Sequence, residues 1–301
     1  MEIVVFGAGS LGSLVGGLLA QPGAHEVTLV ARDPHASAVR TDGLQLAGEF
    51  SETVAPAAVT DGTELTAELA VVTVKSFDTA AAADALSTGS FDAVLSLQNG
   101  MGNEATLAGR LDVPVLAGTA TYGALLREPG VVECTGLGEV ILGPRSGGST
   151  PLADRIGEAF ALSPLETTVA SDMPTRLWRK LAVNAGINPL TALTGTKNEA
   201  VLADPATELA RAATRETAHV ARADGVSLSD ETAVETMTRV ARRTALNSSS
   251  MAQDVRAGRR TEIDAINGYV VERADELGVS VPTNRTLTAL LETWEHGCGL
   301  R

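Results

Sequence analysis

The chain has 301 residues, enough for one or two domains with a sizeable core, and its net charge of −14 argues against a nucleic-acid partner or an anionic membrane. The two cysteines, Cys134 and Cys298, lie far apart in the sequence and predict neither a disulfide framework nor a metal site. No signal-peptide pattern and no membrane-spanning apolar run is evident, so we expect a soluble cytoplasmic protein.

Lysine is unusually rare among the basic residues, because Lys75, Lys180 and Lys197 are the only lysines and arginine supplies the rest. An acidic excess with little lysine is typical of a protein adapted to a cytosol of high salt, where charge repulsion is screened. We therefore hypothesise a halophilic habitat, and a thermal stability that does not fall when salt is removed would contradict it. Each remaining lysine also invites a specific role.

The first element is a short β-branched run at residues 2–6, which predicts a buried parallel strand. It leads directly into GAGSLG and an apolar helix over residues 11–20. This is the GxGxxG pattern in its required setting, and it predicts a pyrophosphate site at the helix N-terminus. The residues we assign to dinucleotide binding are Gly7, Ala8, Gly9, Ser10, Leu11 and Gly12. The alternative is a purely structural glycine turn.

A second strand is predicted at residues 26–30, and Arg32 and Asp33 follow it. A residue at this distance from the glycines reads the ribose of a dinucleotide. An acid favours the free hydroxyl of NAD, whereas an arginine favours the 2′-phosphate of NADP. Because Arg32 comes first after the strand, we favour NADPH, with NADH possible through Asp33.

Two further strands, residues 69–74 and 93–97, end close to Lys75 and Asn99. The carboxyl ends of strands form the ligand-binding edge of an open α/β sheet, so both side chains are predicted to lie near the cofactor. The alternative is a solvated lysine and a helix-capping asparagine.

The other elements expected in the first half are edge strands at 44–46 and 51–58, strands at 113–120, within 131–143 and at 166–170, and helices at 77–86, 103–110 and 152–162.

From residue 171 the pattern becomes helical nearly to the end, which places a domain boundary near Ser171. The chain is thus predicted to be α/β over residues 1–170 and all-helical over 171–301. The helices expected here are 175–188, broken at Pro189, and 198–203, 205–225, 229–246, 251–256, 261–278 and 284–296.

The segment WRKLAVNAGINPLTAL at residues 178–193 carries one polar stripe on an otherwise apolar helix. Lys180, Asn184 and Asn188 follow one another at i, i+4 and i+8 and therefore lie on one face. Such a stripe suits a ligand cleft, although satisfied amides beside a solvated lysine are an equal alternative.

The sequence TEID at residues 261–264 resembles a capping box with aspartate at its fourth position. Glu262 is then predicted in the first turn of a helix, where the helix dipole stabilises a carboxylate. This favourable interaction with the helix dipole would by itself account for a glutamate at position 262.

Taken together, GAGSLG, VKS, QNGMG, WRKLAVNAGINPLTAL, NSSSMAQDVRAGRRTEIDAINGYV and GVSVPTN resemble the ketopantoate reductase family over nearly the whole chain. The resemblance implies an N-terminal Rossmann domain of the doubly wound type and a C-terminal helical domain with the site between them. It also implies reduction of ketopantoate to pantoate with NADPH, on the route to pantothenate and coenzyme A.

By this resemblance Lys180 matches the catalytic lysine and Glu262 the site glutamate. The positions that match or are expected to contact substrate are Asn99, Asn184, Asn188, Asn198, Asn247 and Ser250. On the cofactor side the matches are Gly7, Gly9, Gly12, Arg32, Lys75 and Asn99, and Glu262 is also expected to border the cofactor.

The expected chemistry uses Lys180 as proton donor to the ketone oxygen, because none of the four histidines falls in a plausible site segment. Glu262 would bind the 4-hydroxyl of the substrate, and Ser250 would face the carboxylate. The expected state is a monomer or a homodimer. Two rivals remain: a reductase of another 2-oxo acid or an opine-forming enzyme, and a non-catalytic NADP sensor.

Overall fold

The computed structural model describes residues 1–21 and 23–301, and the chain forms two compact units. The first unit comprises residues 1–98 and 103–173, and the second comprises residues 99–102 and 174–301. The predicted fold class is confirmed, since the first unit is a Rossmann-like α/β domain and the second is helical. The sequence had not predicted that the short segment Asn99–Gly102 would pack with the helical unit.

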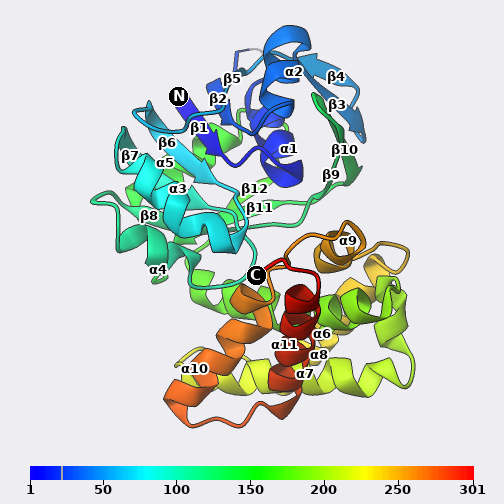
Figure 1. Ribbon diagram of the computed structural model, residues 1–301. Coiled ribbons are helices and arrows are strands. Elements are labelled where there is room, and N and C mark those ends of the chain that lie inside the picture. Colours follow the sequence, from blue (N-terminus) through cyan, green and yellow to red (C-terminus); the bar gives the residue numbers. More distant parts are fainter. Residues whose placement is uncertain (22) are drawn as a thin grey trace. The chain divides into compact units, whose positions relative to one another are not determined.

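The first unit is built on an eight-stranded sheet (Figure 1). In spatial order its strands are β12 (Thr167–Val169), β11 (Val140–Pro144), β8 (Val115–Ala120), β7 (Ser90–Ser96), β6 (Thr66–Val72), β1 (Glu2–Phe6), β2 (Glu26–Val30) and β5 (Ala57–Val59). Neighbouring strands are parallel except for the antiparallel pair of β8 and β11. The sheet is therefore of the doubly wound kind, in which ligands bind at the carboxyl ends of the strands.

Both faces of this sheet are buried, as the nearly continuous apolar strand β1 shows. Ile3 and Val5 belong to one core cluster, whereas Val4 between them belongs to another on the opposite face. The helices of the unit are α1 (Ser10–Leu19), α2 (His35–Asp42), η1 (Ser76–Asp78), α3 (Thr79–Leu86), α4 (Asn103–Ala108) and α5 (Pro151–Phe160). Core residues of α1 and α5 join the first cluster, and those of α3 and α4 join the second.

A second, four-stranded sheet lies beside α1 in the first unit. Its order is β4 (Glu52–Val54), β3 (Leu44–Gly48), β10 (Val131–Gly136) and β9 (Gly123–Glu128). The predicted edge pieces around Gly48 are thus divided between this sheet and β5. Strand β9 was not predicted, although Pro129 and Gly130, with φ +82° at the glycine, form a recognisable turn between β9 and β10.

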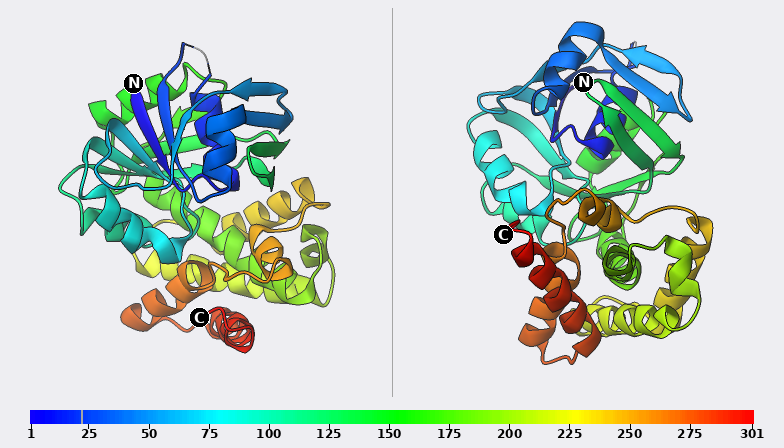
Figure 2. Two further views of the ribbon diagram at one scale, coloured as in Figure 1. Left: turned by 45° about the horizontal axis from the view of Figure 1, so that its top comes forward. Right: turned by 45° about the vertical axis from the view of Figure 1, so that its right-hand side comes forward.

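The second unit consists of helices (Figure 2). They are α6 (Met173–Thr194), η2 (Asn198–Leu202), α7 (Ala206–Ala223), α8 (Asp230–Arg243), α9 (Ser250–Arg256), the π-helix η3 (Asp264–Gly268), α10 (Tyr269–Leu277) and α11 (Pro282–Gly297). Among residues 1–21 and 23–301, no helix has both the length and the apolar character needed to cross a bilayer.

The predicted helix break at Pro189 is wrong, because α6 continues through this residue to Thr194. Proline has no N–H, so it cannot donate to the carbonyl of Ala185 one turn earlier. The Nδ2 of Asn267 donates to that carbonyl instead, at 3.2 Å. A side chain from η3 thus replaces the missing backbone bond and ties η3 to α6.

Candidate functional site

The glycine-rich loop between β1 and α1 divides into glycines required by the fold and one that faces open space. Gly7 has φ +103°, and a Cβ there would lie 2.6 Å from Val74 Cγ1. A Cβ on Gly12 would lie 2.5 Å from the carbonyl oxygen of Gly7. At Gly9 the nearest atom to such a Cβ is the Gly7 oxygen, 4.0 Å away. Packing within the chain does not require a glycine at this position, which suits close approach by a ligand phosphate.

The N-terminus of α1 presents its backbone without a side-chain cap. Gly9 is the N-cap residue, and it makes no side-chain cap hydrogen bond among the described residues. The Ser10 hydroxyl accepts a hydrogen bond from the N–H of Leu126 at 3.0 Å, so it is committed to β9. Any role of Ser10 and Leu11 toward a dinucleotide therefore rests on their backbone N–H groups and on the positive end of the helix dipole.

The ends of three adjacent strands meet at the edge where the glycine loop lies. Phe6 of β1 pairs with Val72 of β6, and Val72 pairs with Ser96 of β7. Lys75 is half-buried in the loop after β6. Gln98, which sequence reasoning did not single out, donates from Nε2 to the carbonyl of Val74 at 3.0 Å. This buried amide joins the loop that follows β7 to the backbone of Val74, the residue before Lys75.

The two residues predicted to read the ribose have different surroundings. The side chain of Arg32 is 93% exposed, and its ion pair with Asp78 is a long contact of 3.4 Å. Asp33 Oδ1 accepts hydrogen bonds from the N–H and the hydroxyl of Ser37 at 3.1 and 2.8 Å. Asp33 is thus partly engaged in ordering α2, whereas the guanidinium of Arg32 extends into solvent.

A buried histidine, His35, is linked to the glycine loop by hydrogen bonds, a role that sequence reasoning missed. The N–H of Gly130 donates to His35 Nδ1 at 2.9 Å, which leaves Nε2 as the protonated nitrogen of the neutral ring. Nε2 lies 2.9 Å from the Ser13 hydroxyl, and this hydroxyl donates to the carbonyl of Ala8 at 3.1 Å. A chain of three hydrogen bonds therefore connects the β9–β10 turn to the glycine loop.

Burial lowers the pKa of His35 below the ordinary value of 6.5. The folded protein thus disfavours the protonated ring more than the unfolded chain does. We expect the His35 contribution to the free energy of unfolding to be intact above pH 6.5 and to be lost as the pH falls below that value toward the lowered pKa. Urea denaturation over a pH series measures this loss.

The matched comparison is His35→Gln against His296→Gln, since His296 is exposed on α11. We expect the first substitution to reduce the acid-side slope of stability and the second to leave it unchanged. Equal slopes in the wild type and in a folded His35→Gln variant would show that His35 does not control this region of the pH profile.

In the helical unit, α6 carries the whole predicted polar stripe on one continuous helix. Lys180 and Asn184 are half-buried, and Asn188 is buried. Trp178 of the same helix is fully buried and lies against Tyr269, with ring centroids 5.9 Å apart. The apolar side of α6 is therefore fixed in the core, which orients the stripe.

The segment Asn99–Gly102 packs on η3 in this unit. The N–H of Met101 donates to the carbonyl of Ala265 at 2.9 Å. Gly100 has φ +80°, and a Cβ there would lie 2.5 Å from the same carbonyl oxygen. This close backbone approach explains the glycine in QNGMG, and it brings Asn99 near the segment that contains Glu262.

Glu262 lies two residues before the start of η3 and is only 5% exposed. The predicted capping box is wrong, because the Thr261 hydroxyl accepts from the N–H of Ile263 at 3.2 Å rather than from Asp264. Asp264 does not bond back to Thr261 but forms an ion pair with Arg260. The carbonyl of Glu262 itself accepts from the N–H groups of Ala265 and Ile266 in η3, which fixes its backbone.

Asn198 and Asn247 lie next to each other on neighbouring segments. The N–H of Asn198 donates to the carbonyl of Asn247 at 3.0 Å, and Asn198 Nδ2 donates to Thr244 Oγ1 at 2.9 Å. The Oδ1 of Asn198 is buried and has no hydrogen-bond partner among the described residues. An acceptor left over in this way is suited to a donor on a ligand.

Ser250 is the exposed first residue of α9, and its neighbour anchors that helix to α6. Ser249 caps α9 by accepting from the N–H of Ala252 at 3.1 Å, and its hydroxyl lies 2.7 Å from Thr191 Oγ1. Thr191 in turn donates to the carbonyls of Ile187 and Asn188. This contact holds the start of α9 beside the end of the polar stripe.

A buried polar network joins the elements that carry these residues. Asn267 Nδ2 donates to Asn284 Oδ1 at 3.0 Å as well as to α6. Asn284 Nδ2 donates to Glu216 Oε2 at 2.8 Å, and this carboxylate also accepts from the N–H groups of Thr283 and Asn284. The network fixes η3, α7 and α11 around α6.

The predicted site residues thus fall into two groups, each within one unit. The first unit holds Gly7, Ala8, Gly9, Ser10, Leu11, Gly12, Arg32 and Lys75. The second unit holds Asn99, Lys180, Asn184, Asn188, Asn198, Asn247, Ser250 and Glu262. Their roles stay predictions.

Two family profiles and one relative that match this chain belong to the same enzyme family. A family profile described as Ketopantoate reductase PanE/ApbA matches residues 3–147, and its C-terminal counterpart matches residues 172–295. A 2-dehydropantoate 2-reductase from Halobacterium salinarum is 45% identical over 97% of this chain and 98% of its own.

Solved structures agree on the fold. A PanE/ApbA family ketopantoate reductase from Ralstonia eutropha is 35% identical, with a TM-score of 0.91 over 99% of this chain and 100% of its own. A D-mandelate dehydrogenase solved with NADH and anilino(oxo)acetate has a TM-score of 0.92 over 100% of both chains, but at 24% identity it shows the fold alone.

Proposed function

This chain belongs to the ketopantoate reductase family, and on that premise we propose that it reduces 2-dehydropantoate to (R)-pantoate with NADPH. The resemblance predicted from the sequence motifs is confirmed. The observation that best supports the proposal is the hydrogen bond from Asn267 of η3 to α6. One helix bears Lys180, Asn184 and Asn188, and Asn267 binds it to the π-helix that follows Glu262.

The first unit has the features that a bound dinucleotide requires. Gly9 leaves open space before an uncapped helix N-terminus, which suits the pyrophosphate. The exposed guanidinium of Arg32 suits a 2′-phosphate, and Lys75 lies at the strand edge. When NADPH is bound, it supplies the hydride for the carbonyl carbon.

Lys180 is the proposed proton donor. Its ammonium group hydrogen-bonds the C2 ketone oxygen and transfers a proton to it as negative charge develops there. The product is then the C2 hydroxyl, and Lys180 recovers its proton from water. Glu262 accepts a hydrogen bond from the substrate 4-hydroxyl, while Asn99, Asn184, Asn188, Asn198, Asn247 and Ser250 orient the substrate.

An absorbance assay of cofactor oxidation with a panel of 2-oxo acids tests this function. We expect rapid, ketopantoate-dependent oxidation of NADPH and slower oxidation with aromatic or unbranched 2-oxo acids. A clear preference for another 2-oxo acid would select the rival reductase. Cofactor binding without oxidation by any of these compounds would select the sensor.

We expect Arg32→Ala to raise the KM for NADPH by about tenfold or more and to change the KM for NADH little, because one charge-assisted contact to the 2′-phosphate contributes roughly 1.5–3 kcal/mol. NADH serves as the internal control, since it lacks this phosphate. Parallel changes in both KM values would remove Arg32 from cofactor discrimination.

The proposed setting is a reducing, salt-rich cytoplasm. Cys134 and Cys298 are both free thiols, which suits a reducing compartment. The net charge of −14 suits a solvent whose ions screen self-repulsion.

A further inference from the structure

The carboxylate of Glu295, in the last turns of α11, binds the residue directly before Glu262. Glu295 Oε1 accepts hydrogen bonds from both the N–H and the hydroxyl of Thr261, at 2.7 and 2.6 Å. Both residues have 0% exposed surface. Charge-assisted bonds of this kind are short and strong, so a distant helix fixes the backbone entering Glu262.

The backbone leaving Glu262 is also fixed. The Thr261 hydroxyl accepts from the N–H of Ile263, and the Glu262 carbonyl accepts from the N–H groups of Ala265 and Ile266, both at 3.1 Å. The helix that follows opens as a π-helix, with the N–H of Gly268 donating to the carbonyl of Ile263. Single π-turns are rare and frequently occur at functional sites.

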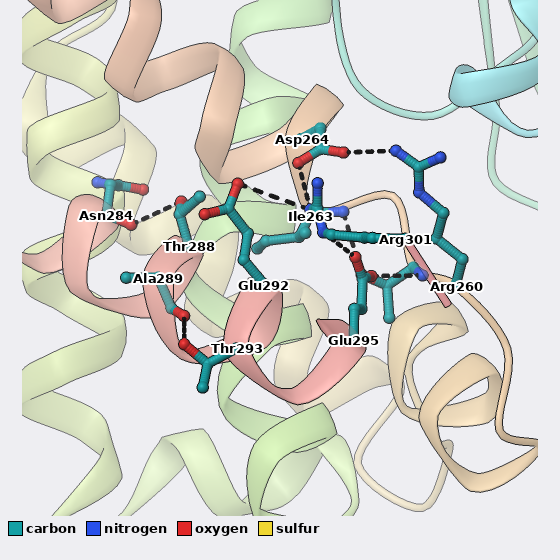
Figure 3. Close-up of polar contacts among 11 residues, drawn as sticks. Arg260, Ile263, Asp264, Asn284, Thr288, Ala289, Glu292, Thr293, Glu295 and Arg301 are labelled. Carbon is teal, nitrogen blue, oxygen red and sulfur yellow. Dashed lines mark hydrogen bonds and ion pairs between the residues drawn. The ribbon is translucent and has the colours of Figure 1, made fainter. Parts of the chain in front are cut away.

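Arg301 compensates the buried charge of Glu295 (Figure 3). Its Nε lies 2.7 Å from Glu295 Oε2, although the geometry is that of an ion pair rather than an aligned hydrogen bond. The same guanidinium contacts Asp264 at 2.6 Å and Glu292 at 3.6 Å. Burial alone would lower the pKa of Arg301, but the ion pairs with these acids raise it, so the group stays charged.

Apolar packing already holds α11 in the second unit through Leu287 and Leu291. A buried ion pair is a poor source of additional stability, because desolvation offsets most of its attraction. The pair of Glu295 and Arg301 is therefore better explained by the geometry that it imposes on residues 261–264 than by the stability that it adds.

We propose that Glu295, held by Arg301, is a positioning residue that acts through Thr261 to aim Glu262 at the substrate. The inference rests on the proposed function of Glu262. It extends the site to α11, which acts on the substrate through Thr261 and Glu262 and not by direct contact.

The test is Glu295→Gln, with Glu292→Gln as the matched control. Glu292 lies one turn earlier on α11 and also pairs with Arg301, but its side chain is 40% exposed and it has no contact with Thr261 among the hydrogen bonds of the described residues. We expect Glu295→Gln to raise the KM for ketopantoate at least about tenfold and to leave the Kd for NADPH within about twofold. The control should leave both constants unchanged.

A double mutant separates positioning from general weakening of the fold. If Glu295 acts through Glu262, then adding Glu295→Gln to Glu262→Ala should raise the KM little beyond the value of Glu262→Ala alone. Additive increases in KM, or an unchanged KM in a folded Glu295→Gln variant, would overturn the proposal. If Glu262→Ala itself leaves the KM unchanged, the proposed role of Glu262 fails first, and the two failures are thereby distinguishable.

Thr261 provides a second route if Glu295→Gln does not fold. Thr261→Val removes the hydroxyl that donates to Glu295, whereas Thr261→Ser keeps it. We expect the valine variant to raise the KM for ketopantoate and the serine variant to restore it. A wild-type KM in Thr261→Val would contradict the positioning role.

Discussion

Replacing Lys180 by alanine is expected to lower kcat by at least about a hundredfold, the lower end of what general acid catalysis contributes. The substitution removes the group proposed to stabilise the developing oxyanion and to supply its proton. It should be measured as kcat with both ketopantoate and NADPH saturating, and the Kd for NADPH should change little.

Two further variants make this expectation specific. Lys197→Ala removes an exposed lysine before η2 and should retain wild-type turnover. Lys180→Arg keeps the positive charge, but a guanidinium does not release its proton in proteins, so substrate binding should recover more than turnover. Near-wild-type kcat in Lys180→Ala would remove this lysine from its role.

Replacing Glu262 by alanine is expected to raise the KM for ketopantoate by about tenfold to a hundredfold, since a hydrogen bond to a charged group contributes roughly 1.5–3 kcal/mol. The physical reason is the loss of the proposed hydrogen-bond acceptor for the substrate 4-hydroxyl. Initial rates over a range of ketopantoate concentrations measure the effect, and a titration with NADPH measures the cofactor affinity separately.

The control for this substitution is Glu272→Gln, an exposed acid in the first turn of α10. It should leave the substrate KM unchanged, as should Glu262→Ala if the carboxylate serves only the helix end. A Glu262→Ala variant whose Kd for NADPH rises more than its KM for ketopantoate would assign the residue to the cofactor instead.

Local patterns predicted much of the first unit. The strand β1 was predicted to the residue, because β-branched residues run up to a glycine that must adopt positive φ. The helix predicted over residues 175–188 contains Lys180 and the two asparagines, and α6 does include all three. Periodicity and glycine chemistry act within a few residues, so the sequence contains them directly.

Features that depend on distant partners could not be predicted in this way. The helix α6 passes Pro189 because Asn267, far along the chain, bonds to the carbonyl that proline leaves without a donor. The capping box at Thr261 failed because Glu295 of α11 takes its N–H. In each case a tertiary contact replaces the local bond that the sequence pattern suggests.

The reduction itself is tested most directly by a single-turnover experiment with equal amounts of enzyme, NADPH and ketopantoate. The product is quantified against the cofactor consumed, with the wild type and Lys180→Ala compared. We expect one pantoate to form for each NADPH oxidised by the wild type, and pantoate to appear much more slowly in the variant. Oxidation of NADPH without pantoate, or equal rates of pantoate formation in the two proteins, would contradict it.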